Sequence, residues 1–269
     1  MIIRSASIAE IDAHGARPDT TPLSALWRGE IAALRIRNLV SAESCQHISE
    51  RLVASDSVVD HADVEGLRVV GLSHFQAARN PALVQRYLRE GRHNAGTLRS
   101  LAAPYASPFD SAIAFVAQLW PAGCQLMELP TEGVLSPFTV RIYRSGVGIE
   151  PHQDILSAES PSDPVARSLV EQFGANLYLS MGTAGGALEL YDTDYSGTGY
   201  TNLAEGPRVF DPRDLPDPTV TIVPVVGDLI IFPSRRIHAV SLSGGQDLRI
   251  TVSFFIGIQG HRTPLKIWA

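Results

Sequence analysis

The chain has 269 residues, of which 45% are hydrophobic and 19% are charged. This composition is typical of a globular protein and excludes a disordered one, and the length fits one large domain or two small ones. Twenty-eight acidic against 22 basic residues give a formal net charge of -6. Because no lysine- or arginine-rich run is present, we do not expect a nucleic-acid partner.

The cysteines and the first residues of the sequence bear on the compartment. Cys45 and Cys124 lie far apart in a chain long enough to need no crosslink, which favours reduced thiols and a cytoplasmic location. Glu10, Asp12 and His14 stand where a signal peptide would need an apolar core. No apolar run approaches the ~20 residues of a membrane span. We therefore expect a soluble, cytoplasmic protein.

The first half of the chain, residues 1–134, is predicted to be a mainly helical support region. Apolar residues recur at helical spacing in CQHISERLVAS (45–55), PALVQRYLREG (81–91) and SPFDSAIAFVAQLW (107–120). Ser41 or Ser44 could cap the first of these helices. The stretch 64–75 between the first two helices could hold a short strand or a substrate loop.

The second half is predicted to be β-rich, with a core over residues 135–260. Short runs bounded by turn residues are PFTVRIYR (137–144), ANLYLSM (175–181), GALELYD (186–192), PTVTIVPVV (218–226), GDLIIFP (227–233) and DLRITVSFFIG (247–257). Six such runs favour a sandwich or barrel within one domain covering residues 1–269. The segment 192–218, rich in glycine, proline and aspartate, is either a lid or a passive insertion.

The triplet His152-Gln153-Asp154 is the strongest local signal for chemistry. On an extended strand, side chains two residues apart share a face, so the imidazole and the carboxylate can converge on one ion. The best third ligand is His238, which follows the predicted strand 227–233. Two histidines and one carboxylate form the facial triad of non-haem Fe(II) oxygenases. The triplet alone is weak evidence, because surface loops contain such a pattern by chance.

Arg249 strengthens this interpretation. It stands eleven residues after His238, and its guanidinium offers a planar fork of donors that matches a carboxylate. A dicarboxylate cosubstrate is the expected anion. Thr251 lies on the same strand face and could bind the same carboxylate. The alternative is that Arg249 pairs with an acid in the protein core.

With these residues in place, the sequence resembles the Fe(II)/2-oxoglutarate-dependent dioxygenases over roughly residues 138–257. Tyr143, Gly146, Pro151, His152 and Asp154 stand at the spacing of the prolyl 4-hydroxylase branch, Y-x-x-G-x-x-x-x-P-H-x-D. The passage ANLYLSMGTAGGALEL is similar to a strand, glycine pair and strand of that branch. GDLIIFP, His238 and Arg249 then follow in order.

The resemblance implies an α+β fold, with a double-stranded β-helix (jelly-roll) core and flanking N-terminal helices. It also implies Fe(II) held by His152, Asp154 and His238, with 2-oxoglutarate and O2 as cosubstrates and Arg249 gripping the distal carboxylate. The expected reaction hydroxylates an unactivated C–H bond and releases succinate and CO2. Arg141 and Tyr143 share a strand face, and either could contact 2-oxoglutarate or orient the ligands.

A second resemblance is to the carrier-free halogenases of indole-alkaloid pathways. In these an arginine also precedes the first metal histidine by eleven residues, as Arg141 precedes His152, and a comparable tail follows, here Leu-Lys-Ile-Trp at 265–268. Those halogenases have glycine at the position of Asp154, and the missing carboxylate opens a site for chloride. Asp154 therefore favours hydroxylation over halogenation.

Three alternatives stay open at this point. The same cofactors could serve desaturation, epimerisation, cyclisation or halogenation. A cupin-like metalloenzyme would use the triad without 2-oxoglutarate, and a jelly-roll binding module would use neither. The expected substrate is a small molecule, either an amino acid derivative or a natural-product intermediate, and the protein could be a monomer or a homodimer. Arginines that could bind an acidic substrate are Arg68, Arg144, Arg235 and Arg236.

Several polar residues receive weaker predictions. Asn176, Tyr178 and Ser180 alternate onto one strand face and could line the cavity, although packing roles are equally expected. The remaining histidines have no partner at ligand spacing and are interpreted as incidental. They are His14, His47, His61, His74, His93 and His261.

Overall fold

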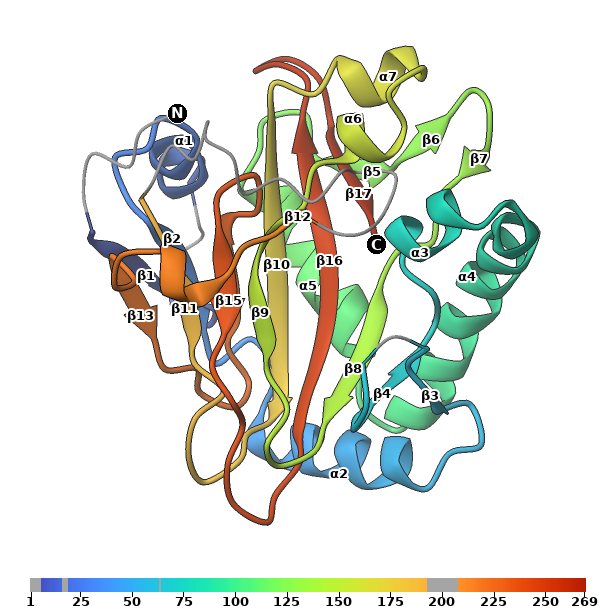
Figure 1. Cartoon of the computed structure of the whole chain (residues 1–269), viewed down its shortest axis with the longest axis vertical. Helices are drawn as coiled ribbons and strands as arrows, with labels where there is room; N and C mark the ends of the chain where they lie inside the picture. Colours follow the sequence, from blue (N-terminus) through green and yellow to red (C-terminus); the bar gives the residue numbers. More distant parts are fainter. Residues whose placement is uncertain (1–5, 16–18, 63, 193–207) are drawn as a thin grey trace.

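Two β-sheets, one larger than the other, organise the fold (Figure 1). The structure is a computed structural model that describes residues 6–15, 19–62, 64–192 and 208–269. Within these residues no helix is both long and apolar enough to cross a bilayer.

The large sheet takes strands from both ends of the chain. Its main order is β1 (Ile8–Asp12), β2 (Ala33–Arg37), β14 (Leu229–Pro233), β10 (Glu171–Ser180), β16 (Arg249–Ile258), β8 (Thr139–Tyr143), β4 (Leu67–Val70) and β3 (Val59–Asp60). β17 (Leu265–Trp268) pairs with the far end of β16 and with β5 (Cys124–Leu126). β6 (Glu128–Leu129) and β7 (Gly133–Val134) form a separate hairpin.

The small sheet has the order β12 (Arg208–Val209), β9 (Ile149–Gln153), β15 (His238–Val240), β11 (Leu188–Leu190) and β13 (Val220–Ile222). The chain moves between the two sheets repeatedly: β8, β10, β14 and β16 belong to the large sheet, and β9, β11, β13 and β15 to the small one. Strands that follow each other in sequence therefore bring side chains to a common space between the sheets.

Helices are α1 (Thr21–Trp27), α2 (Ala42–Val53), α3 (His74–Arg79), α4 (Pro81–Ala102), α5 (Pro108–Gln118), α6 (Leu156–Glu159) and α7 (Pro164–Arg167), with a 3-10 turn over Pro212–Asp214. The apolar faces of α2, α4 and α5 contribute to the core on the outer face of the large sheet. Leu52, Leu98 and Phe115 belong to the same buried cluster as Val140 and Val252. This packing keeps the opposite face of the sheet free for the polar residues described below.

The predicted elements are largely confirmed. α2, α4 and α5 cover the three predicted helices, each of the six predicted strands is present, and the stretch 64–75 contains β4. Ser41 rather than Ser44 caps α2, since its side chain accepts from the Ser44 amide. The N-terminal region also supplies strands: β2 pairs with β14 and β4 pairs with β8, so residues before 135 extend the large sheet on both sides.

The predicted lid, 192–218, is described in part. Residues 193–207 lie outside the described residues. Of the rest, β12 pairs with β9 directly beside His152, and the backbone amide of Asp192 donates to the Thr219 hydroxyl. These contacts attach both ends of the segment to the protein.

Candidate metal centre

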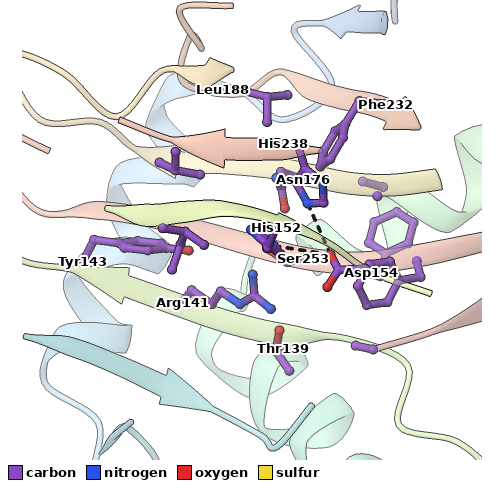
Figure 2. Close-up of a pocket in the computed structure, with 17 residues that line it drawn as sticks. Thr139, Arg141, Tyr143, His152, Asp154, Asn176, Leu188, Phe232, His238 and Ser253 are labelled. Atoms are coloured by element: carbon purple, nitrogen blue, oxygen red, sulfur yellow. Dashed lines mark ion pairs between the residues drawn. The ribbon is translucent and has the colours of Figure 1, made fainter. Parts of the chain in front are cut away.

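A cavity lies between the inner faces of the two sheets (Figure 2). The small sheet contributes His152, His238, Ile149, Leu188 and Val240, and Asp154 follows directly after β9. From the large sheet come Thr139, Arg141, Tyr143, Gly174, Asn176, Phe232, Ser253 and Phe255, and Ala269 closes one side. His152, Asp154, His238 and Arg141 give this lining its ionisable groups, and the other lining residues are apolar or uncharged.

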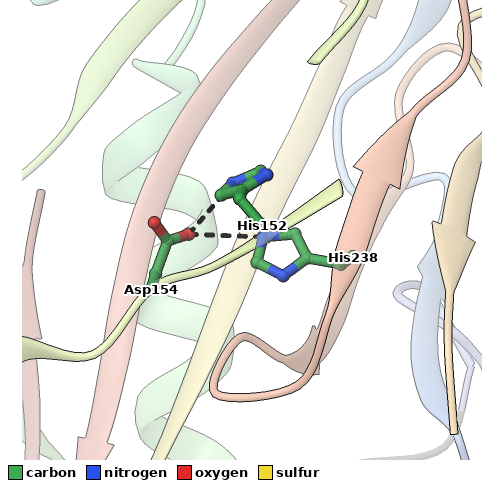
Figure 3. Close-up of side chains that lie close together, drawn as sticks. All are labelled: His152, Asp154 and His238. Atoms are coloured by element: carbon green, nitrogen blue, oxygen red, sulfur yellow. Dashed lines mark ion pairs between the residues drawn. The ribbon is translucent and has the colours of Figure 1, made fainter. Parts of the chain in front are cut away.

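The cavity contains His152, Asp154 and His238 in one group (Figure 3). His152 and His238 are register partners across the antiparallel β9–β15 pair, so their side chains leave the sheet on the same face. The carboxylate Oδ2 of Asp154 lies 3.2 Å from Nε2 of His238 and 3.6 Å from Nε2 of His152. One potential ligand atom from each residue lies within 4.8 Å of the others. The three residues predicted to hold a metal therefore meet at one point.

Backbone carbonyls fix the orientation of both imidazoles. Nδ1 of His152 lies 2.8 Å from the carbonyl oxygen of Glu150, and Nδ1 of His238 lies 2.9 Å from that of Arg236. A carbonyl only accepts hydrogen bonds, so each Nδ1 carries the proton. Each Nε2 is thereby directed toward Asp154, and it is the nitrogen that would coordinate a metal bound between the three side chains.

The charges of the three groups are strongly coupled. Burial alone would raise the pKa of Asp154, but the two adjacent histidines hold it well below its usual value. Burial works against a charged His152, yet Asp154 outweighs it and raises the pKa of this histidine. Burial and the neighbouring His152 lower the pKa of His238. Two imidazole nitrogens and an ionised carboxylate are a donor set that suits a divalent transition metal.

Arg249 lies deep in the fold, on the same inner face. Its side chain is 1% exposed, and its guanidinium carbon lies 4.5 Å from the ring centre of Tyr143 and 5.3 Å from that of Tyr178. Nε donates to the carbonyl oxygen of Gly186 at 3.3 Å. Within the described residues, Nη1 has no hydrogen-bond partner and no acid pairs with the guanidinium. The expectation that Arg249 could pair with a core acid is therefore not met there.

Such a buried cation is costly unless an anion completes it. The main-chain position of Gly186 contributes to this site: a Cβ there would lie 2.9 Å from Cδ of Arg249, and the residue has a φ of +68°. Thr251, also buried, follows on the same face, and its hydroxyl lies 3.2 Å from that of Ser253. The surroundings of Arg249 thus fit a bound carboxylate.

Arg141 lies nearer to the metal ligands. It is half-buried on β8, is the register partner of Thr251 and points into the cavity between the sheets (Figure 2). Its positive charge is one of the influences that lower the pKa of His152. Tyr143, two residues on, packs its ring against Arg249. The two residues share a face, as predicted.

The polar row on β10 is divided between several roles. Asn176 lines the cavity, the ring of Tyr178 packs beside Arg249, and the hydroxyl of Ser180 donates to the carbonyl of Leu248. Thr139 and Ser253, which also line the cavity, were not predicted. They are register partners, and each lies two residues from a predicted site residue, so the two-residue strand period would have found them.

The four arginines considered for binding an acidic substrate do not line this cavity. Arg68 donates to the carbonyl of Val58, Arg235 donates to that of Val170, and Arg236 pairs with Asp192. Arg144 is exposed. The described contacts give these arginines structural roles or leave them in solvent.

His74 corrects the prediction for the other histidines. Its side chain is 1% exposed and lies between the carboxylates of Glu132 and Glu159. His14, His93 and His261 are exposed, and His47 and His61 are partly exposed. No pattern in the sequence indicated the two carboxylates, which lie 58 and 85 residues after His74.

Comparison with known proteins places the chain in a family. The model of the carrier-protein-independent halogenase WelO5 matches residues 6–269. The chain belongs to this family. It thereby belongs to the Fe(II)/2-oxoglutarate-dependent oxygenase superfamily, as the motifs predicted. No curated protein matches the sequence.

Solved structures have a similar fold at low sequence identity. An N-substituted L-amino acid dioxygenase from Burkholderia ambifaria AMMD, in complex with alpha-KG, is 16% identical, with a TM-score of 0.57 over 93% of this chain and 91% of that one. HygX from Streptomyces hygroscopicus, with nickel and 2-oxoglutarate bound, is 14% identical, with a TM-score of 0.47 over 87% and 86%. The first of these two structures shows that a protein of known structure has a similar fold over nearly all of this chain.

Proposed function

We propose that this protein is an Fe(II)/2-oxoglutarate-dependent hydroxylase of a small molecule, which releases succinate and CO2. The observation that carries this proposal is the position of Asp154, whose carboxylate joins two correctly oriented imidazoles at one point. The carrier-free halogenases that the sequence resembles have glycine at this position. With Asp154 the protein supplies three ligands, and a site for chloride is filled by its own carboxylate.

The proposed metal ligands are His152, Asp154 and His238. Bound Fe(II) would supply the activation of O2 and the oxidation of the substrate C–H bond. The protein's own contribution is to fix the ligands, through the carbonyls of Glu150 and Arg236, and to place an apolar ring, that of Phe232, 5.0 Å from the ring of His238.

Arg249 is proposed to bind the distal carboxylate of 2-oxoglutarate. Its free Nη1, its enclosure by two tyrosine rings and the adjacent Thr251 hydroxyl support this assignment. Tyr143 would hold the guanidinium in place. The positive charge of Arg141 acts to lower the pKa of His152, and Arg141 is proposed to contact the cosubstrate near the metal. The neighbour from B. ambifaria, crystallised with alpha-KG, supports the same cosubstrate here.

The arrangement of strands supports a jelly-roll core. Four strands of the large sheet, β8, β16, β10 and β14, face four of the small sheet, β9, β15, β11 and β13. In a double-stranded β-helix the chain alternates between two such sheets, with one pair of successive strands in the same sheet. We include in the proposal one domain over residues 1–269 and a cytoplasmic location.

The substrate is proposed to be an amino acid derivative or a natural-product intermediate. The described lining combines Phe232, Phe255 and Leu188 with a few hydroxyl and amide groups, which suits a compact, partly apolar molecule. The B. ambifaria neighbour is a dioxygenase of N-substituted L-amino acids, which favours the first of these classes.

Halogenation is the second candidate, because the family model that matches residues 6–269 is that of a halogenase. The two candidate reactions differ in the group that is added to the substrate. With chloride or bromide in the buffer, halogenation adds the halogen mass to the substrate, whereas hydroxylation adds one oxygen atom whatever the halide. Desaturation, epimerisation or cyclisation would each give a further product mass or stereochemistry.

The deciding experiment is anaerobic titration of the protein with Fe(II) and 2-oxoglutarate, followed by a succinate-release screen of candidate substrates. We expect a visible charge-transfer band in the wild type and none in H152A. Metal binding without this band would favour a cupin-like enzyme. Failure to bind Fe(II) or Mn(II) stoichiometrically would favour a binding module and overturn the proposal.

A further inference from the structure

Among the described residues, His74 is a deeply buried histidine outside the metal centre, and its ring bridges two acids. Nδ1 lies 2.7 Å from Oε2 of Glu159, and Nε2 lies 3.2 Å from Oε2 of Glu132. Both ring nitrogens can donate only when the imidazole is protonated. The side chains of Glu132 and Glu159 are themselves only 18% and 11% exposed. We call His74, Glu132 and Glu159 the clasp.

Two further groups lie close to the clasp. The Tyr87 ring of α4 lies edge-on to the imidazole, with 5.9 Å between ring centres. Asp163 at the start of α7 lies close enough to Glu132 to raise the pKa of that glutamate, although His74 dominates and lowers it. Burial lowers the pKa of His74, but the two glutamates outweigh burial and raise it to about 9. The clasp therefore carries an imidazolium between two carboxylates at neutral pH.

The clasp joins segments that are remote in sequence. His74 begins α3, Glu159 ends α6, and Glu132 lies in the turn between β6 and β7. The Ser160 hydroxyl also donates to Glu132, which ties the end of α6 to the same turn. Three surface segments are thus held by one buried cation.

Two segments next to the clasp also lie at the wall of the cavity. α6 begins at Leu156, two residues after Asp154, and the Leu156 amide donates to the Gln172 side chain. The backbone amide of His74 and the hydroxyl of Tyr87 both donate to the carbonyl of Ala269, which lines the cavity. In Figure 1, α3 lies beside the end of β17 that carries Ala269.

We infer that His74 is a positioning residue: the clasp holds the segment that follows Asp154, and the chain at Ala269, in the places that the metal centre requires. This inference rests on the proposed function, because it assigns the clasp to the wall of the same cavity. Glu159 is the direct link to the Asp154 segment, and the backbone of His74 is the direct link to Ala269.

The test is amide hydrogen exchange at pH 7, measured by mass spectrometry, together with Mn(II) binding to the full chain. The variants are His74→Gln and Glu159→Gln. The matched control is His47→Gln. The ring of His47 also lies edge-on to a tyrosine, Tyr105, but it contacts the carbonyl of Ala103 instead of two carboxylates. Glu159→Gln keeps the His74–Glu132 contact and serves if His74→Gln fails to fold.

We expect exchange in residues 155–160 and 265–269 to become about tenfold faster in both clasp variants, while β2 on the other side of the large sheet keeps its wild-type rate. The Mn(II) dissociation constant should rise about tenfold or more, which is the lower end of the range for groups that orient metal ligands. His47→Gln should change neither quantity.

Each other outcome counts against the inference. Unchanged exchange in the two segments would show that the clasp does not hold them. An equal increase in β2 would indicate a general loss of stability, and faster local exchange with unchanged Mn(II) affinity would separate the clasp from the metal centre. If the wild type binds no Mn(II), the proposed function fails, and the exchange pattern still decides whether the clasp holds these segments.

Discussion

His152 and His238 are direct register partners across β9 and β15, and their ring centres lie 4.2 Å apart. A cross-strand pair with this geometry needs only one further ligand on the same face, and Asp154 provides it from the residue after β9. The pairing of β9 with β15 therefore brings the two histidine ligands together. Four predictions about the metal centre and its surroundings can be tested by substitution.

Asp154→Gly should remove one of three metal ligands. We expect hydroxylation to fall by at least about 100-fold, since even residues that only orient ligands contribute 10- to 100-fold. Mass spectrometry in chloride or bromide then tests whether the variant forms a halogenated product, as the family relationship suggests. Asp56→Gly, at an exposed position, is the control. Wild-type hydroxylation in Asp154→Gly would contradict the assignment of Asp154 as a ligand.

Arg249→Gln should weaken 2-oxoglutarate binding by about 100-fold without changing Mn(II) affinity, because it removes the buried cation for the distal carboxylate. Arg249→Lys should recover only part of the loss, since a lysine cannot reproduce the planar fork. The intensity of the Fe(II) chelate band during titration measures both effects. Arg144→Gln, at an exposed position next to Tyr143, is the matched control. Equal 2-oxoglutarate affinity in all four proteins would contradict the assignment of Arg249 to the distal carboxylate.

Gly186→Ala should also weaken 2-oxoglutarate binding, by about tenfold. The new Cβ would lie 2.9 Å from Cδ of Arg249, and the φ of +68° costs about 1–2 kcal/mol for a residue with a side chain. Titration of the chelate band and thermal unfolding report the two consequences separately. Gly96→Ala in α4 is the control, because a Cβ there meets nothing within 4 Å and alanine favours a helix. A Gly186→Ala protein with wild-type affinity would show that Arg249 has room to move.

The clasp predicts how stability depends on pH. The pKa of His74 is raised from 6.5 to about 9 by its two glutamates, so the folded protein holds a proton that the unfolded chain releases between these values. The stabilisation is complete below pH 6.5 and is lost as the pH rises to 9, by about 3 kcal/mol at most. Urea unfolding of the wild type and of His74→Gln at several pH values measures this. A wild-type stability that is flat between pH 6.5 and 9 relative to the variant would contradict the prediction.

The sequence allowed prediction of those parts of the site that depend on local spacing. His152 and Asp154 are two residues apart, and the strand period explains why they converge. His238 and Arg249 were identified by their order in a family motif. Pairing places His238 beside His152 in the small sheet and Arg249 beside Tyr143 in the facing large sheet. Thr139 and Ser253 could have been predicted in the same way, because they lie two residues from Arg141 and Thr251 on the same strands.

Contacts between remote residues could not be predicted in this way. The glutamates of the clasp lie 58 and 85 residues from His74, and no periodicity connects them. The strands β1 and β2 were missed for a similar reason: β2 pairs with β14, and the Arg35–Asp228 ion pair beside this contact spans 193 residues. The capping box of Ser73 and Gln76 is a local sequence signal for the start of α3 at His74.

The extension of the large sheet by β2 on one side and β4 on the other has a practical meaning for protein engineering. A fragment trimmed to residues 135–269 would keep the three metal ligands and Arg249, yet β14 and β8 would become bare edges with unsatisfied backbone groups. Such edges invite association with other chains. The shortest working catalyst derived from this chain should therefore retain the segments that contain β2 and β4.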